Sequence, residues 1–161
     1  MAAIAADWRA SANTDALVTG ALGGVGSAAG CLVGGYWCDR MDRKQAYWLF
    51  GLAQAGCAVA MAFSPRTQLM YIAYVMLYAF ISGLTYAAFS AVVLEAIGQG
   101  AAATKYNLFA SLSNMPIAYV TLVDGWAHTR AGVEAMLQAE ALLCLAGILV
   151  FFGAVALARR R

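Results

Sequence analysis

Long stretches without charged side chains alternate with short charged clusters along the chain. Five such stretches cover residues 16–38, 45–65, 67–94, 106–123 and 141–158. Each is about as long as the roughly 17–25 residues that a helix needs to cross ~30 Å of hydrocarbon, or slightly longer. Because hydrocarbon offers the backbone no hydrogen-bond partners, each stretch is expected to be helical. The pattern predicts one domain, 1–161, an all-α membrane protein with five transmembrane helices.

The predicted helices cover about 14–37, 46–63, 66–95, 104–124 and 135–158. Their ends are predicted from residues that cap or break helices. Candidate N-caps are residues 13–15 for the first helix, Ser64 with Pro65 after it for the third, and Thr104 for the fourth. The glycines in 98–100 are expected to end the third helix, and Pro116 is expected to kink the fourth.

The composition supports a membrane location. Hydrophobic residues make up 63% of the chain and charged residues 11%, and the mean hydropathy is +0.72. A soluble domain of this length has too little interior for that much apolar surface. The lipid bilayer is therefore an expected partner, and no basic patch with interleaved aromatics points to nucleic acid. No catalytic or metal-ligand constellation is present in the sequence, so we expect neither an enzyme nor a cofactor or metal.

The basic residues are distributed unevenly between the two sets of loops. If the first helix ends inside, the cytoplasmic side receives Arg40, Arg43, Lys44, Lys105, Arg159, Arg160 and Arg161. The other side receives Arg9, Arg66 and Arg130. This bias predicts an external N-terminus and a cytoplasmic C-terminus in the cell (inner) membrane. Five helices with an external N-terminus are expected if helices upstream in a longer chain are missing.

The turn between the first two predicted helices contains the most specific motif. Its residues with expected roles are Gly35, Asp39, Arg40, Arg43 and Lys44. Gly35 would let backbones approach closely, and Asp39 is an anion at a helix end, where it can meet a neighbouring helix N-terminus. The three basic residues can form charge-assisted bonds across the cytoplasmic face and contact anionic headgroups. A plain positive-inside loop is the alternative interpretation.

The pattern Gly-x-x-x-Asp-Arg-x-x-Arg-Lys resembles the cytoplasmic loop signature of the major facilitator superfamily. That signature follows the second helix and recurs, weaker, after the eighth; Asp42 stands where the family usually has glycine. The resemblance implies part of a twelve-helix fold with two six-helix halves. Four predicted helices follow the motif, as expected for helices eight to twelve, and the chain end at 159–161 favours this register over helices two to six. The segment 103–126 also resembles a subgroup with muropeptide permeases and acetyl-CoA transporters.

Two predicted helices carry polar side chains at three- and four-residue steps. In the third helix these are Tyr71, Tyr74, Tyr78, Ser82 and Thr85, and in the fourth Asn107, Ser111, Asn114 and Thr121. Each set is expected to share a helix face. In the major facilitator fold the corresponding tenth and eleventh helices border the central cavity, so the resemblance implies that these residues, other than Tyr71, line it. The alternative is hydrogen bonding between helices, with Tyr71 in the aromatic belt.

Two further features have alternative interpretations. Gly26, Gly30 and Gly34 recur at four-residue intervals, which predicts close helix packing in lipid or a sliding surface. Glu95 and Asp124 are expected to close the third and fourth helices. Acidic groups at membrane depth indicate proton coupling, whereas at helix ends they are ordinary loop charges.

The resemblance implies a transmembrane transporter of a small polar solute such as a sugar or peptide. Alternating access needs two halves around a midplane site. This chain would therefore be a segment that is not competent alone. The alternative function is a non-transporting remnant, or a helper subunit that pairs with another membrane chain supplying the missing N-terminal helices.

Overall fold

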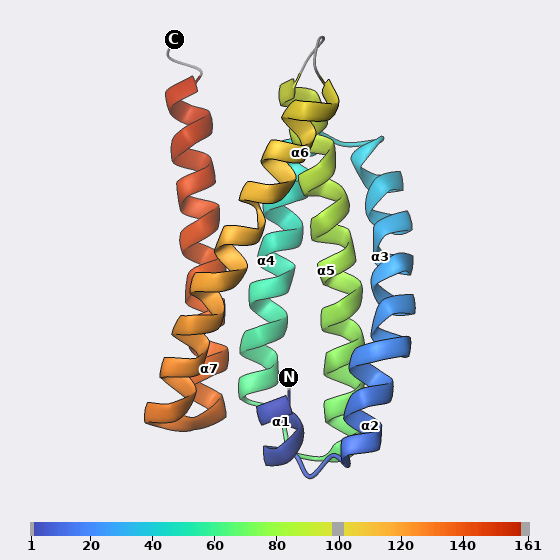
Figure 1. The fold of residues 1–161 in the computed structure, drawn as a ribbon, viewed down its shortest axis with the longest axis vertical. Helices are drawn as coiled ribbons and strands as arrows, with labels where there is room; N and C mark the ends of the chain where they lie inside the picture. Colours follow the sequence, from blue (N-terminus) through green and yellow to red (C-terminus); the bar gives the residue numbers. More distant parts are fainter. Residues whose placement is uncertain (1, 98–101, 159–161) are drawn as a thin grey trace.

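The structure is a computed structural model that describes residues 2–97 and 102–158, and all elements in this part of the chain are helices (Figure 1). In chain order they are α1 (Ala2–Asp7), α2 (Ala12–Leu17), a π-helical turn (Val18–Leu22), α3 (Gly23–Cys38), α4 (Arg43–Ala62), α5 (Gln68–Ile97), α6 (Ala102–Leu112) and α7 (Asn114–Ala158). Within the described residues, three helical segments are long and apolar enough to cross a membrane. These are Ala12–Cys38, Gln68–Ile97 and Ala103–Leu157.

The third of these segments contains a reversal of direction. Gly132 in α7 has φ 81° and ψ −168°, a conformation outside the helical range. Side chains are essentially excluded from this backbone region, so glycine is required there. Figure 1 shows two arms of α7 that run in opposite directions from the reversal. We call residues 114–131 the first arm and 133–158 the second arm.

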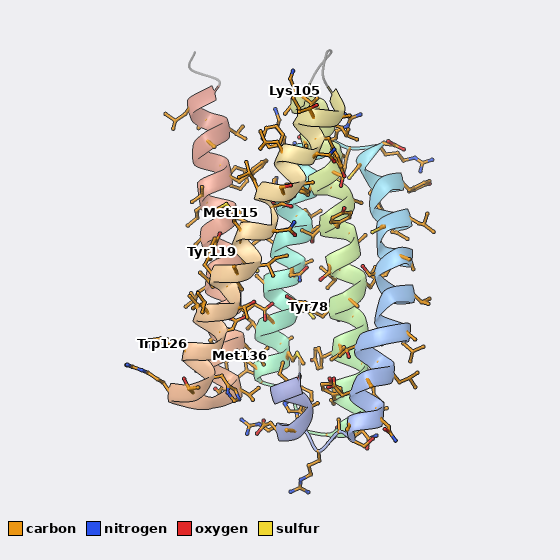
Figure 2. All side chains as sticks on the ribbon, in the orientation of Figure 1. Tyr78, Lys105, Met115, Tyr119, Trp126 and Met136 are labelled. Carbon is orange, nitrogen blue, oxygen red and sulfur yellow. The ribbon has the colours of Figure 1, made fainter. Side chains whose placement is uncertain are left out.

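The long helices stand side by side in alternating directions (Figure 1). At one end lie α1, the α4–α5 connection and the reversal of α7, and we call this the N end. At the other, the C end, lie the α3–α4 turn, the start of α6 and the last turns of α7. Figure 2 shows Lys105 at the C end and Trp126 near the N end.

The contact between α3 and α5 depends on small residues. Gly26, Gly30 and Gly34 are buried, and a Cβ atom added at Gly34 would lie 2.9 Å from the Leu84 Cα atom. A Cβ added at Gly30 would overlap the carbonyl oxygen of Phe80. The predicted close packing of the glycine face is therefore confirmed.

A buried cluster closes the N end. The short helix α1 was not predicted, and its side chains Ile4 and Trp8 are each 1% exposed. They pack with residues of α4, α5, the π-helical turn and the second arm: Val18, Met61, Tyr71, Val75, Val133 and Leu137. Arg66 reinforces this end through ion pairs with Asp7 at 3.3 Å and Glu134 at 4.0 Å.

The outer surface of the helices is apolar. Leu32, Leu122, Leu149 and Val150 are 78%, 74%, 71% and 73% exposed. Large aliphatic side chains at such exposure along whole helices form the type of surface that lipid covers. An apolar exterior on a helical bundle agrees with the membrane location expected from the composition.

The predicted N-caps of the first and third helices are wrong. Ser11 caps α2, because its side chain accepts a bond from the Thr14 N–H at 3.1 Å, so the cap precedes residues 13–15. Thr67 caps α5 by accepting from the Met70 N–H at 3.3 Å. Ser64 bonds instead to the Ala60 carbonyl at 2.7 Å. α5 starts at Gln68, so Pro65 is not at its first helical position.

The fourth predicted helix also differs from the observed one. Thr104 lies inside the first turn of α6 and does not precede it. The helix breaks at Ser113, between α6 and α7. Pro116 follows three residues later, and because proline has no N–H, one carbonyl of the preceding turn lacks its helical hydrogen bond. Asp124 does not close this helix, because the first arm continues to the reversal at Gly132. The predicted breaker at 98–100 and the basic residues 159–161 lie outside the described residues.

Candidate functional site

Two polar side chains of α5 form contacts with Gln54 of α4. Ser82 accepts a hydrogen bond from the Gln54 Nε2 atom of α4 at 3.0 Å. Thr85 Oγ1 lies 3.5 Å from Gln54 Oε1 and donates to the Ile81 carbonyl at 3.0 Å. Gln54 therefore joins two residues of the predicted α5 face. Bonds of this kind between helices are one of the two interpretations of the polar face.

Three tyrosines of the same face also have specific partners. Tyr71 donates to Asp15 at the N end. The Tyr74 hydroxyl lies 2.6 Å from Ser64 Oγ. Tyr78 donates to Glu140 of the second arm, and Figure 2 shows it far from either end of α5. Glu140, which directly precedes the uncharged stretch 141–158, was not predicted as a site residue. Its position inside the predicted helix 135–158, five residues from the start, was the available signal.

An open cavity of 370 Å³ lies between α3 and α5 beside the polar face, and Thr19, Gly20 and Gly24 on its wall are exposed. Tyr78 and Ser82 line it from α5, and Thr19 and Ser27 line it from the α3 side. The remaining lining residues are small or apolar: Gly20, Gly23, Gly24, Val75 and Ala79. The volume is that of a site for a small molecule. Thr19 already donates to the Asp15 carbonyl at 2.6 Å and Tyr78 to Glu140, so Ser27 and Ser82 supply the donors, and all four hydroxyl oxygens can accept. Thr19 and Ser27 were not predicted, although their eight-residue spacing puts them on one helix face.

The predicted polar residues of the fourth helix lie elsewhere. Asn107, Ser111, Asn114 and Thr121 are exposed. Asn114 Nδ2 donates to the Ala110 carbonyl at 3.2 Å and Thr121 Oγ1 to the Ile117 carbonyl at 2.7 Å, both within the same helical stretch. None of the hydrogen bonds found between described residues joins this set to the α5 face.

The turn between α3 and α4 is held by charges. Asp42 Oδ1 accepts from the Gln45 N–H at 2.9 Å and so caps α4, which explains the presence of a carboxylate at this position. Arg43 and Lys44 pair with Glu95 of α5 at 3.7 Å and 4.0 Å. Glu95 of α5 thus pairs with two of the three basic residues of the motif.

The other motif residues have different surroundings. The Arg40 guanidinium lies 3.6 Å from the centre of the Tyr36 ring, within cation–π range. Asp39 is exposed and has no ion pair among those found between described residues. The expectation for Gly35 is wrong: a Cβ there would meet no atom within 4 Å. The close approach occurs one residue earlier, at Gly34, because the glycine face of α3 repeats every four residues from Gly26.

Comparison of the chain with protein-family models, with curated proteins and with solved structures gives no match.

Proposed function

We propose that this chain spans the membrane five times and forms the C-terminal part of a major facilitator-type transporter for a small polar solute. The two arms of α7 support the count, because α6 continued by the first arm runs from the C end to the N end and the second arm runs back (Figure 1). Together with α3, α4 and α5, these two stretches make five antiparallel helical segments. The basic residues Arg40, Arg43, Lys44 and Lys105 belong to the C end, which we assign to the cytoplasm of the inner membrane.

The cavity between α3 and α5 is the observation that carries the solute-binding proposal. Apart from its four hydroxyls, its walls are small or apolar. A neutral solute with hydroxyl or amide groups, such as a sugar or a short peptide, can exchange hydrogen bonds with Thr19, Ser27, Tyr78 and Ser82. Ring stacking on Tyr78 would add an apolar contact. A charged solute has no counter-ion among these lining residues.

A thermal-shift screen of the purified chain in detergent tests this proposal. We expect a subset of neutral sugars or peptides to raise the melting temperature, since a ligand that binds the folded state stabilises it. Ser82→Ala should weaken that shift. Ser90→Ala, two turns further along α5 and outside the cavity, should leave it unchanged. Equal shifts in both variants, or no shift with any solute, would refute binding in this cavity.

The motif contacts support the assignment to a moving transporter half. Glu95 near the end of α5 pairs with Arg43 at 3.7 Å and with Lys44 at 4.0 Å, and these ion pairs connect α5 to the α3–α4 turn. Such exposed pairs are weak, so they can open and re-form as helices move. The chain alone is expected to give no solute counterflow in liposomes, because alternating access needs an opposing half. Robust counterflow would contradict the assignment of this chain as one part of a transporter.

A helper subunit is the second candidate function, and Asp39 favours it. This exposed carboxylate lies at the C-terminal end of α3, an unfavourable place for an anion unless a further basic group or helix N-terminus meets it. We expect a photo-crosslinker at Asp39 to capture a membrane protein in native membranes, with the same crosslinker at Trp37 as the control. Capture only of lipid or of nothing from residue 39 would favour a chain without a partner.

A further inference from the structure

The pair formed by Tyr78 and Glu140 is half-buried and lies far from the ends of its helices. Glu140 is eight residues from the reversal at Gly132, which corresponds to about 12 Å along the helix. Tyr78 is ten residues from the first residue of α5, or about 15 Å. Both therefore lie well inside the apolar segments Gln68–Ile97 and Ala103–Leu157. A carboxyl group at this depth lacks the water that stabilises its charge.

A second carboxyl group lies at the same depth. Asp124 precedes Gly132 by eight residues, the same interval by which Glu140 follows it, so the two arms bring both carboxyls to one level. The Asp124 Oδ1 atom is buried and has no hydrogen-bond partner among the described residues. Two negative charges at this level would repel each other, so at most one of the carboxyls can be ionised there at low cost.

Among the described residues, no basic side chain forms an ion pair with Glu140. Cys144 follows it by one helical turn on the same arm, and Cys57 lies on α4, which packs against α7. At the N end, Arg66 is already paired with Asp7 of α1 and with Glu134. None of the ion pairs found between described residues includes Glu140 or Asp124.

We propose that Glu140, together with Tyr78 and Asp124, forms a proton-binding site within the membrane. One proton from bulk water adds to the carboxylate and gives a neutral carboxylic acid, with no bond broken and no electron transferred. The Glu140 Oε1 atom accepts a hydrogen bond from the Tyr78 hydroxyl, and Tyr78 keeps its proton. The proton taken from bulk water is therefore held on Oε2. Asp124 disfavours release of the proton, because release would place a second charge beside its own. The proposal rests on the membrane placement of α5 and α7 proposed above, and it shares Tyr78 with the solute-binding proposal.

Infrared spectroscopy of the full chain in lipid vesicles tests this site. A protonated carboxyl absorbs separately from a carboxylate, so its band can be followed as the pH rises. We expect a carboxylic acid band that persists at neutral pH and is lost in Glu140→Gln. The matched control is Glu134→Gln, which changes a carboxyl on the same arm that is exposed and paired with Arg66. That control should leave the band unchanged.

Tyr78→Phe gives an independent measurement. Removal of the phenolic donor should shift the acid band to higher frequency, because a hydrogen bond to the carbonyl oxygen lowers its stretching frequency. Circular dichroism verifies the helix content of each variant. A neutral-pH band that is missing in the wild type, or retained in Glu140→Gln, would overturn the proposal. Alkaline extraction of the same vesicles separates the two proposals: a chain that is extracted refutes membrane placement, whereas a chain that stays without the band refutes only the proton site.

Discussion

The glycine contact between α3 and α5 makes a strong prediction about stability. Replacing Gly30 by alanine adds one Cβ atom that would lie 3.0 Å from the Phe80 carbonyl carbon and 3.1 Å from the Gly83 Cα atom, and closer still to the Phe80 carbonyl oxygen. All three are backbone atoms, which cannot rotate away as a side chain can. The two helices must therefore move apart along this face.

The expected cost follows from two opposing terms. Alanine in place of a helix-interior glycine gains up to about 1 kcal/mol from backbone preference. Overpacking of a tight contact costs about 1–3 kcal/mol, and a contact made only of backbone atoms puts Gly30 at the upper end of that range. We expect a net loss of about 1–2 kcal/mol for Gly30→Ala. At Gly24 an added Cβ meets no atom within 4 Å, so Gly24→Ala should raise the free energy of unfolding by up to about 1 kcal/mol.

Melting of the purified chain in detergent, followed by size-exclusion chromatography, measures the difference. At about 2–4 °C per kcal/mol, Gly30→Ala should melt about 2–8 °C below the wild type, and Gly24→Ala at or above it. Both variants are the same chemical change on one helix, so general effects of alanine cancel. If Gly30→Ala melts as high as Gly24→Ala, α3 and α5 do not pack on this face.

Three further changes can be measured by the same melting assay. Thr67→Ala removes the N-cap of α5 and should cost about 1 kcal/mol; no change would mean that α5 starts elsewhere. Glu95→Gln removes the ion pairs with Arg43 and Lys44 and should cost at most about 1 kcal/mol, an effect that high salt abolishes; a loss that persists in high salt would indicate another role. Gln54→Leu and Ser82→Ala should show a coupling of about 0.6 kcal/mol in a double-mutant cycle, and additive losses would exclude their hydrogen bond.

Those parts of the fold that depend on local pattern were predictable from the sequence. The glycine spacing from Gly26 to Gly34 identifies a packing face without knowledge of its partner, because only small residues allow backbones to touch. The uncharged stretches likewise predict helices, since a backbone in lipid has no other way to satisfy its polar groups. The break near Pro116 follows from the missing N–H of proline. Each of these inferences needs only neighbouring residues.

Features that depend on partners distant in the sequence were missed. Ser64 has the chemistry of an N-cap, yet its hydroxyl bonds to the Ala60 carbonyl and lies beside Tyr74, because Ser64 directly follows the last turn of α4 and α5 starts only at Gln68. The α5 face was predicted as a set of residues, but its partners Gln54 and Glu140 lie on other helices. Thr19 and Ser27 join that face only because close packing of α3 brings them to the cavity. Tertiary contacts decide which of several equivalent polar groups are used.

The depth of the two carboxyls depends on a single backbone position. In the sequence, Asp124 ends the predicted fourth helix and Glu140 lies near the start of the predicted fifth, and only the reversal at Gly132 brings them to the same level. A helix advances by about 100° and 1.5 Å per residue. A reversal displaced by one residue would therefore turn Glu140 about a quarter of the way around the second arm and away from Tyr78. The positive φ of Gly132 fixes where the chain reverses, and through that register it determines which acidic side chain meets the tyrosine of α5.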